Sequence, residues 1–290
     1  MDRWAGRVAL VTGASMGIGA ALCKELVKRG MKVVACARTE SKLKALADEL
    51  EGEKGEVHPF AMDVSKDEQV VAAFEFVKEK LGGVDVCVAN AGMAVGGTIL
   101  ESFVGGTSPE EKPAATYRYK SLHDPILLLY FSLPIGGKPN DWRAQLDVNL
   151  TGTLHCAQLA IKGMLERGVD DGQVILIGSA LGYQATKHPE LHFYSLTKCA
   201  LKASATALRR ELLAKKSRIR VSNVSPGYVD TEFASRAIGI PSQAMRAKLN
   251  EISMEPLQVQ DVVDAIIHTL STPPRVQVHD LLFLPTDEDY

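Results

Sequence analysis

A tyrosine and a lysine four residues apart, Tyr194 and Lys198, are the side chains of this sequence best suited to acid–base chemistry. The pattern around them is helical, and residues four apart on a helix lie on the same face. A free phenol has a pKa of about 10 and is a poor proton donor at neutral pH. A nearby ammonium group favours the phenolate, so we expect Lys198 to lower the pKa of Tyr194 and make it a usable donor to a carbonyl oxygen.

A serine hydroxyl precedes this pair, because Ser179 follows an apolar strand expected at 174–177. Ligands of parallel sheets bind at the carboxyl ends of strands. The Ser179 hydroxyl can therefore hydrogen-bond the carbonyl oxygen that receives the proton of Tyr194, as that oxygen gains charge. Alone, Ser179 and Tyr194 are equally well explained by surface or packing roles. A second pair with the same spacing, Tyr183 and Lys187, lies between Gly182 and Pro189, so we place it in a loop and reject Tyr183 as the acid.

A glycine-rich turn near the N-terminus is the element that these side chains must face. An apolar strand at 8–11 runs into Gly13, Gly17 and Gly19, after which the periodicity becomes helical. Glycines let the backbone approach a pyrophosphate, and the free N–H groups of the following helix favour an anion. The spacing Gly-x-x-x-Gly-x-Gly fits the general dinucleotide fingerprint only loosely, and a tight turn without a ligand is the alternative.

Strands and helices alternate along the rest of the chain. Further strands are expected at 32–37, 57–61, 84–89, 174–177, 220–224 and 277–284, with helices at 40–50, 65–81, 141–167, 193–215 and 259–270. The strands are almost continuously apolar, as strands buried on both faces are. The pattern predicts one α/β domain over residues 1–290, a doubly wound parallel sheet with helices on both faces.

Two segments interrupt this pattern. An atypical insertion at about 98–138 is rich in glycine and proline, and Gly96-Gly97-Thr98 would join naturally to Gly137-Lys138-Pro139. A connection between elements tolerates added length of this kind better than a core does. One hypothesis is an alternative or mis-assembled transcript; the segment would then block substrate, disturb assembly or loop out harmlessly. A mobile-looking segment at 231–256 has apolar side chains that form either a substrate lid or ordinary helix packing.

Composition excludes several functions. The net charge of −2 gives no attraction to nucleic acid or to an anionic membrane surface. No apolar run reaches the roughly 20 residues of a membrane span, and the N-terminal apolar run is too short for a signal peptide. The five cysteines are scattered singly, which indicates a reducing compartment, and the cytoplasm is the expected location. The histidines have no metal-ligand spacing, so no metal is expected.

The combined motifs resemble the short-chain dehydrogenase/reductase family. They are, in order, Gly13-x-x-x-Gly17-x-Gly19, Asp63-Val64, Asn90-Ala91-Gly92, Asn149, Ser179, Tyr194-x-x-x-Lys198 and Ser225-Pro226-Gly227. The resemblance covers the chain except the insertion and implies a Rossmann-type fold. A narrower similarity, through Lys32–Thr39, His192–Ser195 and Pro285-Thr286, is to NADPH-dependent reductases of ketosteroids and other carbonyl compounds.

The resemblance implies a role for each matching residue. Tyr194 is the proton donor, Lys198 also holds the nicotinamide ribose, Ser179 positions the carbonyl, and Asn149 anchors a water that leads to Lys198. The cofactor residues are Gly13, Ser15, Gly17, Ile18 and Gly19 in the turn, Asp63 and Val64 at the adenine, Asn90 and Gly92 on the floor, and Pro226, Gly227, Val229 and Thr231 near the carboxamide. The family also implies a homodimer or homotetramer.

The end of the second strand indicates which cofactor is used. A site for NAD has an acidic residue about 20 positions past the glycines, whereas a 2′-phosphate favours arginine. Here Arg38 and Thr39 follow the strand, with no carboxylate before Glu40, so NADP(H) is favoured. The turn lacks a second basic residue at Ser15-Met16, and Arg38 as a plain surface charge is the alternative.

The function expected from these residues is reduction of a steroid or another apolar ketone by hydride transfer. Two alternatives stay open. The insertion favours a catalytically idle dinucleotide-binding protein, and a 3-oxoacyl thioester or a sugar is a different substrate for the same chemistry. The sequence at 231–256 has no basic patch for a carrier or nucleotide.

Overall fold

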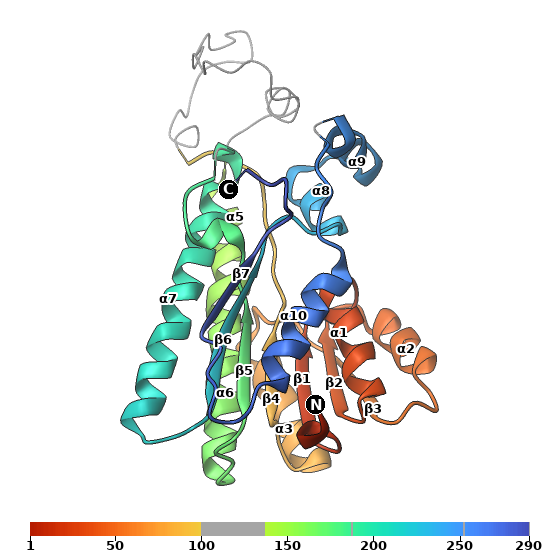
Figure 1. The fold of residues 1–290 in the computed structure, drawn as a ribbon, viewed down its shortest axis with the longest axis vertical. Helices are drawn as coiled ribbons and strands as arrows, with labels where there is room; N and C mark the ends of the chain where they lie inside the picture. The colour runs from red at the N-terminus through yellow and green to blue at the C-terminus, as the bar shows by residue number, and fades with distance from the viewer. Residues whose placement is uncertain (100–136, 187, 252, 290) are drawn as a thin grey trace.

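A parallel seven-stranded sheet forms the centre of the part of the chain that the computed structural model describes, residues 1–99, 137–186, 188–251 and 253–289. The spatial order is β3-β2-β1-β4-β5-β6-β7 (Figure 1). The strands are β1 (Val8–Thr12), β2 (Lys32–Ala37), β3 (Glu56–Ala61), β4 (Val86–Ala89), β5 (Gln173–Ile177), β6 (Arg220–Pro226) and β7 (Asp280–Phe283). The predicted doubly wound sheet is therefore confirmed.

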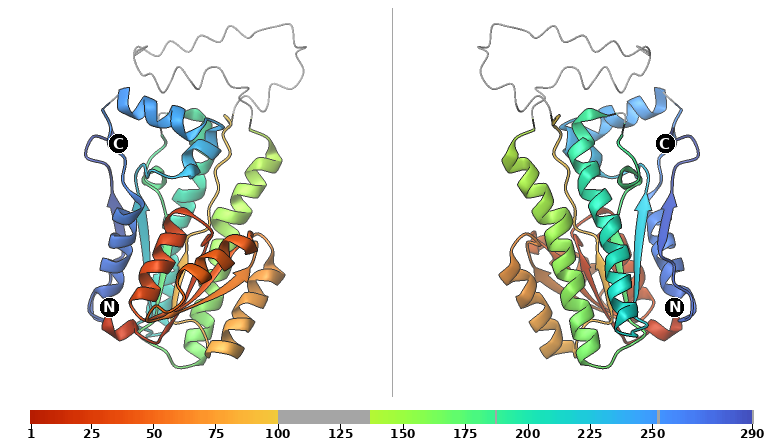
Figure 2. Two further views of the ribbon diagram at one scale, coloured as in Figure 1. Left: turned by 90° about the vertical axis from the view of Figure 1, so that its right-hand side faces the viewer. Right: turned by 90° about the vertical axis from the view of Figure 1, so that its left-hand side faces the viewer.

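Helices cover both faces of this sheet (Figure 2). They are α1 (Gly17–Lys28), α2 (Glu40–Glu49) and α10 (Val259–Ser271) on one face, and α3 (Asp67–Leu81), α6 (Thr153–Glu166) and α7 (His192–Ala214) on the other. Leu22 and Ile266 are fully buried in the first layer, and Cys156 and Leu201 are buried in the second. Because chain crossings run in opposite directions from β1, the β1–β4 boundary is a switch point, where such sheets bind ligands.

Several predicted element ends are wrong by a few residues. The helix α3 begins at Asp67 instead of the predicted residue 65, and Lys66 is its N-cap residue. The Ser65 hydroxyl does not cap the helix, because it donates to the Asp63 carboxylate at 2.8 Å. The helix α5 (Pro139–Leu146) starts two residues before the predicted start at 141, since the fixed φ of proline suits the first helical position.

The long helix predicted from Asp141 is also not uniform, since a π-helical turn, η3 (Asp147–Gly152), separates α5 from α6. A Cβ atom on Gly152 would lie 2.2 Å from the carbonyl oxygen of Val64, so only glycine allows this approach.

The segment 231–256 is helical rather than irregular. It contains α8 (Glu232–Ile238) and α9 (Ser242–Glu251), which lie together at the end of the molecule beyond the strand ends (Figure 1). A small apolar cluster joins them, which we call the lid cluster: Ala237, Ile240, Met245 and Leu249. The helical pattern is hard to see in the sequence, because both helices are short, only three residues separate them, and glycine and serine lie at their ends.

The insertion predicted at about 98–138 lies almost wholly outside the described residues. Its two ends are described, and the backbone N–H of Gly137 donates to the carbonyl oxygen of Thr98 at 3.3 Å. Gly97 is held in turn by the carbonyl oxygen of Glu190, at 3.0 Å. The two ends of the segment therefore meet, as the predicted join requires.

Candidate active site

A large cleft opens along the carboxyl ends of the strands, with a volume of about 1530 Å³. Of the residues predicted to form the site, every one except Gly19 and Asn149 lines it. These are Gly13, Ser15, Gly17, Ile18, Arg38, Thr39, Asp63, Val64, Asn90, Gly92, Ser179, Tyr194, Lys198, Pro226, Gly227, Val229 and Thr231. Gly19 and Asn149 lie directly behind this lining.

The glycine turn is shaped by close backbone contacts. Gly13 and Gly17 have φ values of 68° and 53°, in the left-handed region that glycine adopts without strain. A Cβ atom on Gly19 would lie 2.3 Å from the Gly13 carbonyl oxygen and 2.7 Å from the side-chain nitrogen of Asn90. All three glycines are thus required by conformation or by space, which leaves bare backbone and the start of α1 facing the cleft.

Asn90 and the strand β1 hold the floor of the cleft. The Thr12 hydroxyl accepts from the backbone N–H groups of Asn90 and Ala91, at 3.0 and 2.9 Å. The Asn90 amide donates to the Thr12 carbonyl oxygen at 2.9 Å. The sequence motifs identified Asn90 but not Thr12, whose role depends on β1 and β4 being neighbours.

The end of the cleft beside β2 and β3 is positively charged. Arg38 and Thr39 line it as predicted, and Lys42, one turn into α2, adds a second cation that the sequence analysis did not single out. Asp63 also lies here. Burial raises its pKa, but hydrogen bonds from Ser65 and the charges of Arg38 and Lys66 outweigh this and hold the pKa below its usual value.

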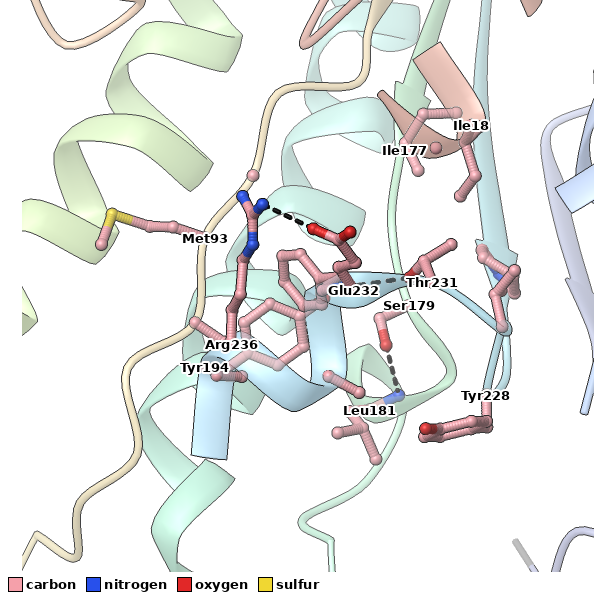
Figure 3. A pocket seen from close by; sticks show the side chains of 18 of the residues that line it. Ile18, Met93, Ile177, Ser179, Leu181, Tyr194, Tyr228, Thr231, Glu232 and Arg236 are labelled. Atoms are coloured by element: carbon pink, nitrogen blue, oxygen red, sulfur yellow. Dashed lines mark hydrogen bonds and ion pairs between the residues drawn. The ribbon is translucent and has the colours of Figure 1, made fainter. Parts of the chain in front are cut away.

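The reacting end of the cleft brings Ser179, Tyr194 and Lys198 together. Figure 3 shows Ser179 and Tyr194 at this end. Tyr194 lies in the first turn of α7 and is 8% exposed, with the side chain of Ser179 near enough to affect its pKa. Ser179 caps the short helix η4 (Ala180–Gly182), where its oxygen accepts from the Leu181 N–H at 3.2 Å. The Lys198 ammonium nitrogen lies 5.6 Å from the centroid of the Tyr194 ring and donates to the Ile177 carbonyl oxygen at 2.8 Å.

The expected lowering of the Tyr194 pKa by Lys198 is wrong for this geometry. Burial raises the pKa of Tyr194 to about 12, and the hydrogen bond from Ser179 only partly offsets it. Burial also lowers the pKa of Lys198 to about 8. The sequence shows that the two groups share a helix face, but it does not show that both are desolvated, and desolvation is the larger effect.

Asn149 lies in the π-helical turn η3 and is fully buried. Its side-chain oxygen accepts from the Met93 N–H at 2.8 Å, and its nitrogen donates to the Met93 carbonyl oxygen at 2.8 Å and to the Thr197 hydroxyl at 3.0 Å. Asn149 therefore fixes the segment after β4 against α7. Its predicted water-anchoring role stays a prediction.

Tyr183, from the second Tyr-x-x-x-Lys copy, lies outside the cleft. The Tyr183 hydroxyl donates to the Asp280 carboxylate on β7, and Tyr183 does not line the cleft. Lys187 lies outside the described residues.

Apolar and charged groups beyond Tyr194 complete this end. Phe233, at the start of α8, packs against Tyr194 with ring centroids 5.7 Å apart. Met245 and Leu249 of the lid cluster also line the cleft. The two arginines here are paired: Arg236 with Glu232 at 2.5 Å (Figure 3), and Arg246 with Asp230 at 3.2 Å. The 231–256 side chains therefore both pack together and border the cleft; nothing is described for the side chain of Ile238.

Two kinds of feature bear on function in the described part of the chain: groups of metal ligands and helices that could span a membrane. No three His, Cys, Asp or Glu side chains in it form a group that would hold a metal ion. None of its helices has both the length and the apolar character needed to cross a bilayer.

Comparisons with known proteins identify the family. The short chain dehydrogenase family model matches residues 7–103 and 136–238, so the chain belongs to this family. Between its two parts the model leaves out 104–135, within the predicted insertion. The predicted resemblance is thus confirmed.

Relatives in curated collections match over almost the full chain. Dehydrogenase/reductase SDR family member 11 of Gallus gallus is 38% identical over 99% of both chains, and its Homo sapiens counterpart is 34% identical over 99% of this chain and 97% of its own. Farnesol dehydrogenase of Aedes aegypti is 35% identical over the whole of both chains.

Solved structures share the fold. A closed form of serine dehydrogenase complexed with NADP+ has a TM-score of 0.77 at 23% identity, covering 98% of this chain and 96% of its own. A metagenomic short-chain oxidoreductase in complex with NADP has a TM-score of 0.70 at 24% identity, covering 98% of each chain.

Proposed function

We propose that this protein catalyses the NADPH-dependent reduction of an apolar ketone to an alcohol. The observation that carries the proposal is the group formed by Ser179 and the buried Tyr194 and Lys198, which lies in the same cleft as the glycine turn. The chain's membership of an oxidoreductase family supports this reading.

The residues of the cleft fit a dinucleotide. The bare backbone of the glycine turn and the start of α1 would hold the pyrophosphate, because free N–H groups at a helix start bind anions. Arg38, Thr39 and Lys42 would hold a 2′-phosphate, which supports NADPH over NADH. The NADP-bound state of two structural relatives agrees with this choice. Bound NADPH supplies the hydride.

Tyr194 and Ser179 perform the remaining chemistry. A ketone oxygen between the two hydroxyls accepts a hydrogen bond from Ser179 and then the proton of Tyr194. Because burial keeps the pKa of Tyr194 at about 12, the phenol is protonated at neutral pH, as a proton donor must be. Lys198, with its pKa at about 8, is still mostly charged at pH 7 and stabilises the phenolate left behind.

The walls of the reacting end support an apolar substrate. Phe233, Met245 and Leu249 border it, and both of its arginines are paired with carboxylates. An anionic 3-oxoacyl carrier would find no unpaired arginine among these residues. The expectation of a steroid or similar ketone rests on these apolar side chains and on the relatives named SDR family member 11.

The test is consumption of NADPH by the purified protein with a steroid ketone, an aromatic ketone and an aliphatic ketone, followed at the absorbance of reduced nicotinamide. We expect turnover with NADPH and much slower turnover with NADH. Binding of NADPH without turnover of any carbonyl compound would instead support a catalytically idle protein.

A second candidate is oxidation of an apolar primary alcohol, which the 35% identical farnesol dehydrogenase favours. The same site would serve, with Tyr194 accepting the proton of the alcohol. Burial of Tyr194 opposes this direction at neutral pH, because the phenolate that must accept the proton is disfavoured. Farnesol with NADP+ therefore belongs in the same assay, and faster oxidation than ketone reduction at pH 7 would favour this candidate.

A further inference from the structure

The C-terminal segment Leu284–Asp289, which we call the C-terminal strap, reaches the reacting end of the cleft. Its Asp287-Glu288-Asp289 sequence is acidic, and as a sequence it is expected to be solvated. Glu288 is instead half-buried and lines the cleft, so that expectation is wrong for this residue. The strap lies at the same end of the molecule as α8 and α9 (Figure 2).

Glu288 is tied to the loop that follows β6. Its carboxylate accepts a hydrogen bond from the backbone N–H of Tyr228 at 2.8 Å. A Cβ atom on Gly227 would lie 2.2 Å from the same carboxylate oxygen, so only glycine at 227 allows the contact. Burial raises the pKa of Glu288, although the hydrogen bond from Tyr228 opposes the rise.

This contact completes a clamp around residues 228–230. On the other side of the loop, the Leu257 N–H donates to the Tyr228 carbonyl oxygen at 3.0 Å, and the Asp230 N–H donates to the Leu257 carbonyl oxygen at 2.8 Å. The Tyr228 side chain packs against the lid cluster. The loop leads directly to Val229 and Thr231, the residues expected at the nicotinamide end of the cofactor. Figure 3 shows Tyr228 and Thr231.

We propose that Glu288 is a positioning residue for the reaction: its carboxylate holds the Tyr228 amide, and thereby sets the loop that carries Val229 and Thr231 at the nicotinamide end of the cleft. This inference rests on the proposed function for its catalytic consequence. The hydrogen bond is charge-assisted, so it is stronger than an ordinary one. A substitution far from Tyr194 in the sequence should therefore alter cofactor binding and turnover.

The test compares Glu288→Ala with Glu288→Gln, which keeps an acceptor oxygen of the same reach, and with a chain that ends at Thr286. Thr286→Ala is the matched control, because Thr286 is exposed and does not line the cleft. The first measurement is hydrogen exchange of the Tyr228 amide by mass spectrometry in the full-length protein. The second is the Kd for NADPH by fluorescence titration, and the third is kcat and KM for an accepted ketone.

Glu288→Ala and the shortened chain should accelerate exchange at Tyr228 by about tenfold, the effect of one lost hydrogen bond to a charged group. Both should raise the Kd for NADPH severalfold and lower kcat, while the unfolding midpoint should fall by only the few degrees that one lost hydrogen bond costs. Glu288→Gln should restore most of each loss, and Thr286→Ala should match the unaltered protein.

Unchanged exchange at Tyr228 in Glu288→Ala overturns the proposal. Faster exchange with unchanged Kd, kcat and KM overturns it as well, since the contact would then be structural only. If the unaltered protein reduces no ketone, the proposed function fails, while the exchange and NADPH titrations still decide the role of Glu288.

Discussion

Gly19 offers a direct test of the close backbone contacts that shape the glycine turn. In Gly19→Ala the new Cβ atom would lie 2.3 Å from the Gly13 carbonyl oxygen and 2.7 Å from the Asn90 side-chain nitrogen. Backbone on one side and a hydrogen-bonded amide on the other leave little room for adjustment. The Asn90 amide donates to Thr12 and Gly13, at 2.9 and 3.4 Å, and both bonds would be displaced.

The magnitude follows from opposing contributions. Overpacking costs about 2 kcal/mol, in the middle of its usual range. Weakening two hydrogen bonds costs about 1–2 kcal/mol in total. Better helix propensity of alanine returns at most about 1 kcal/mol. The net prediction is a loss of about 2–3 kcal/mol in the free energy of unfolding, with the Kd for NADPH raised at least about tenfold because the turn must move.

The matched control is Gly163→Ala in α6, where a new Cβ atom meets nothing within 4 Å. Only the propensity contribution acts there, so this variant should be more stable by about 0.5–1 kcal/mol and bind NADPH normally. Urea unfolding and NADPH fluorescence titration measure both quantities. Equal stability of the two variants, or normal NADPH binding by Gly19→Ala, would refute the reasoning about the turn.

Three further predictions address the cofactor, the pH dependence and the insertion. Arg38→Ala and Lys42→Ala should each raise the Kd for NADPH by about tenfold and leave the Kd for NADH within about threefold. Lys44→Ala, which loses only an exposed ion pair with Glu40, is the control. Equal effects on the two cofactors would contradict the assignment of Arg38 and Lys42 to the 2′-phosphate. The rate of ketone reduction should be constant between pH 6 and about 7 and should fall as the pH rises past about 8. Lys198 loses its proton there, whereas Tyr194, with its pKa at about 12, keeps its own. A rate that rises through pH 9 would contradict this reasoning. Replacing residues 99–136 by Asn-Gly should change the free energy of unfolding by no more than about 1 kcal/mol and should keep NADPH binding. The hydrogen bond from Gly137 to Thr98 then closes a two-residue turn. An insoluble product or lost NADPH binding would show that the core depends on the insertion.

The sheet was predictable because its signals are local. Buried strands such as Val8–Thr12 are almost continuously apolar, and the glycines of the first turn mark the change from strand to helix. Parallel order follows from the alternation of strands and helices. The site residues at strand ends were predictable for the same reason, since parallel strands deliver their carboxyl ends to one edge.

Features that depend on distant parts of the chain were not predictable. The contact of Glu288 with Tyr228 joins residues 60 apart in sequence, and nothing in the acidic tail indicates it. The pKa of Tyr194 depends on burial by the surrounding elements, which a helical spacing does not report. Lys42 was missed because its approach to the cleft depends on how α2 packs beside the sheet, which the sequence of the helix does not report.

The central claim is that the Tyr194 phenol delivers the proton during ketone reduction. The most direct measurement compares Tyr194→Phe with the unaltered protein in NADPH-dependent reduction of one accepted ketone, with the Kd for NADPH titrated on the same preparations. We predict that kcat falls by about 10²–10⁴ while the Kd for NADPH stays within about threefold, because general acid catalysis contributes a factor of this size. Undiminished kcat in Tyr194→Phe would contradict the account.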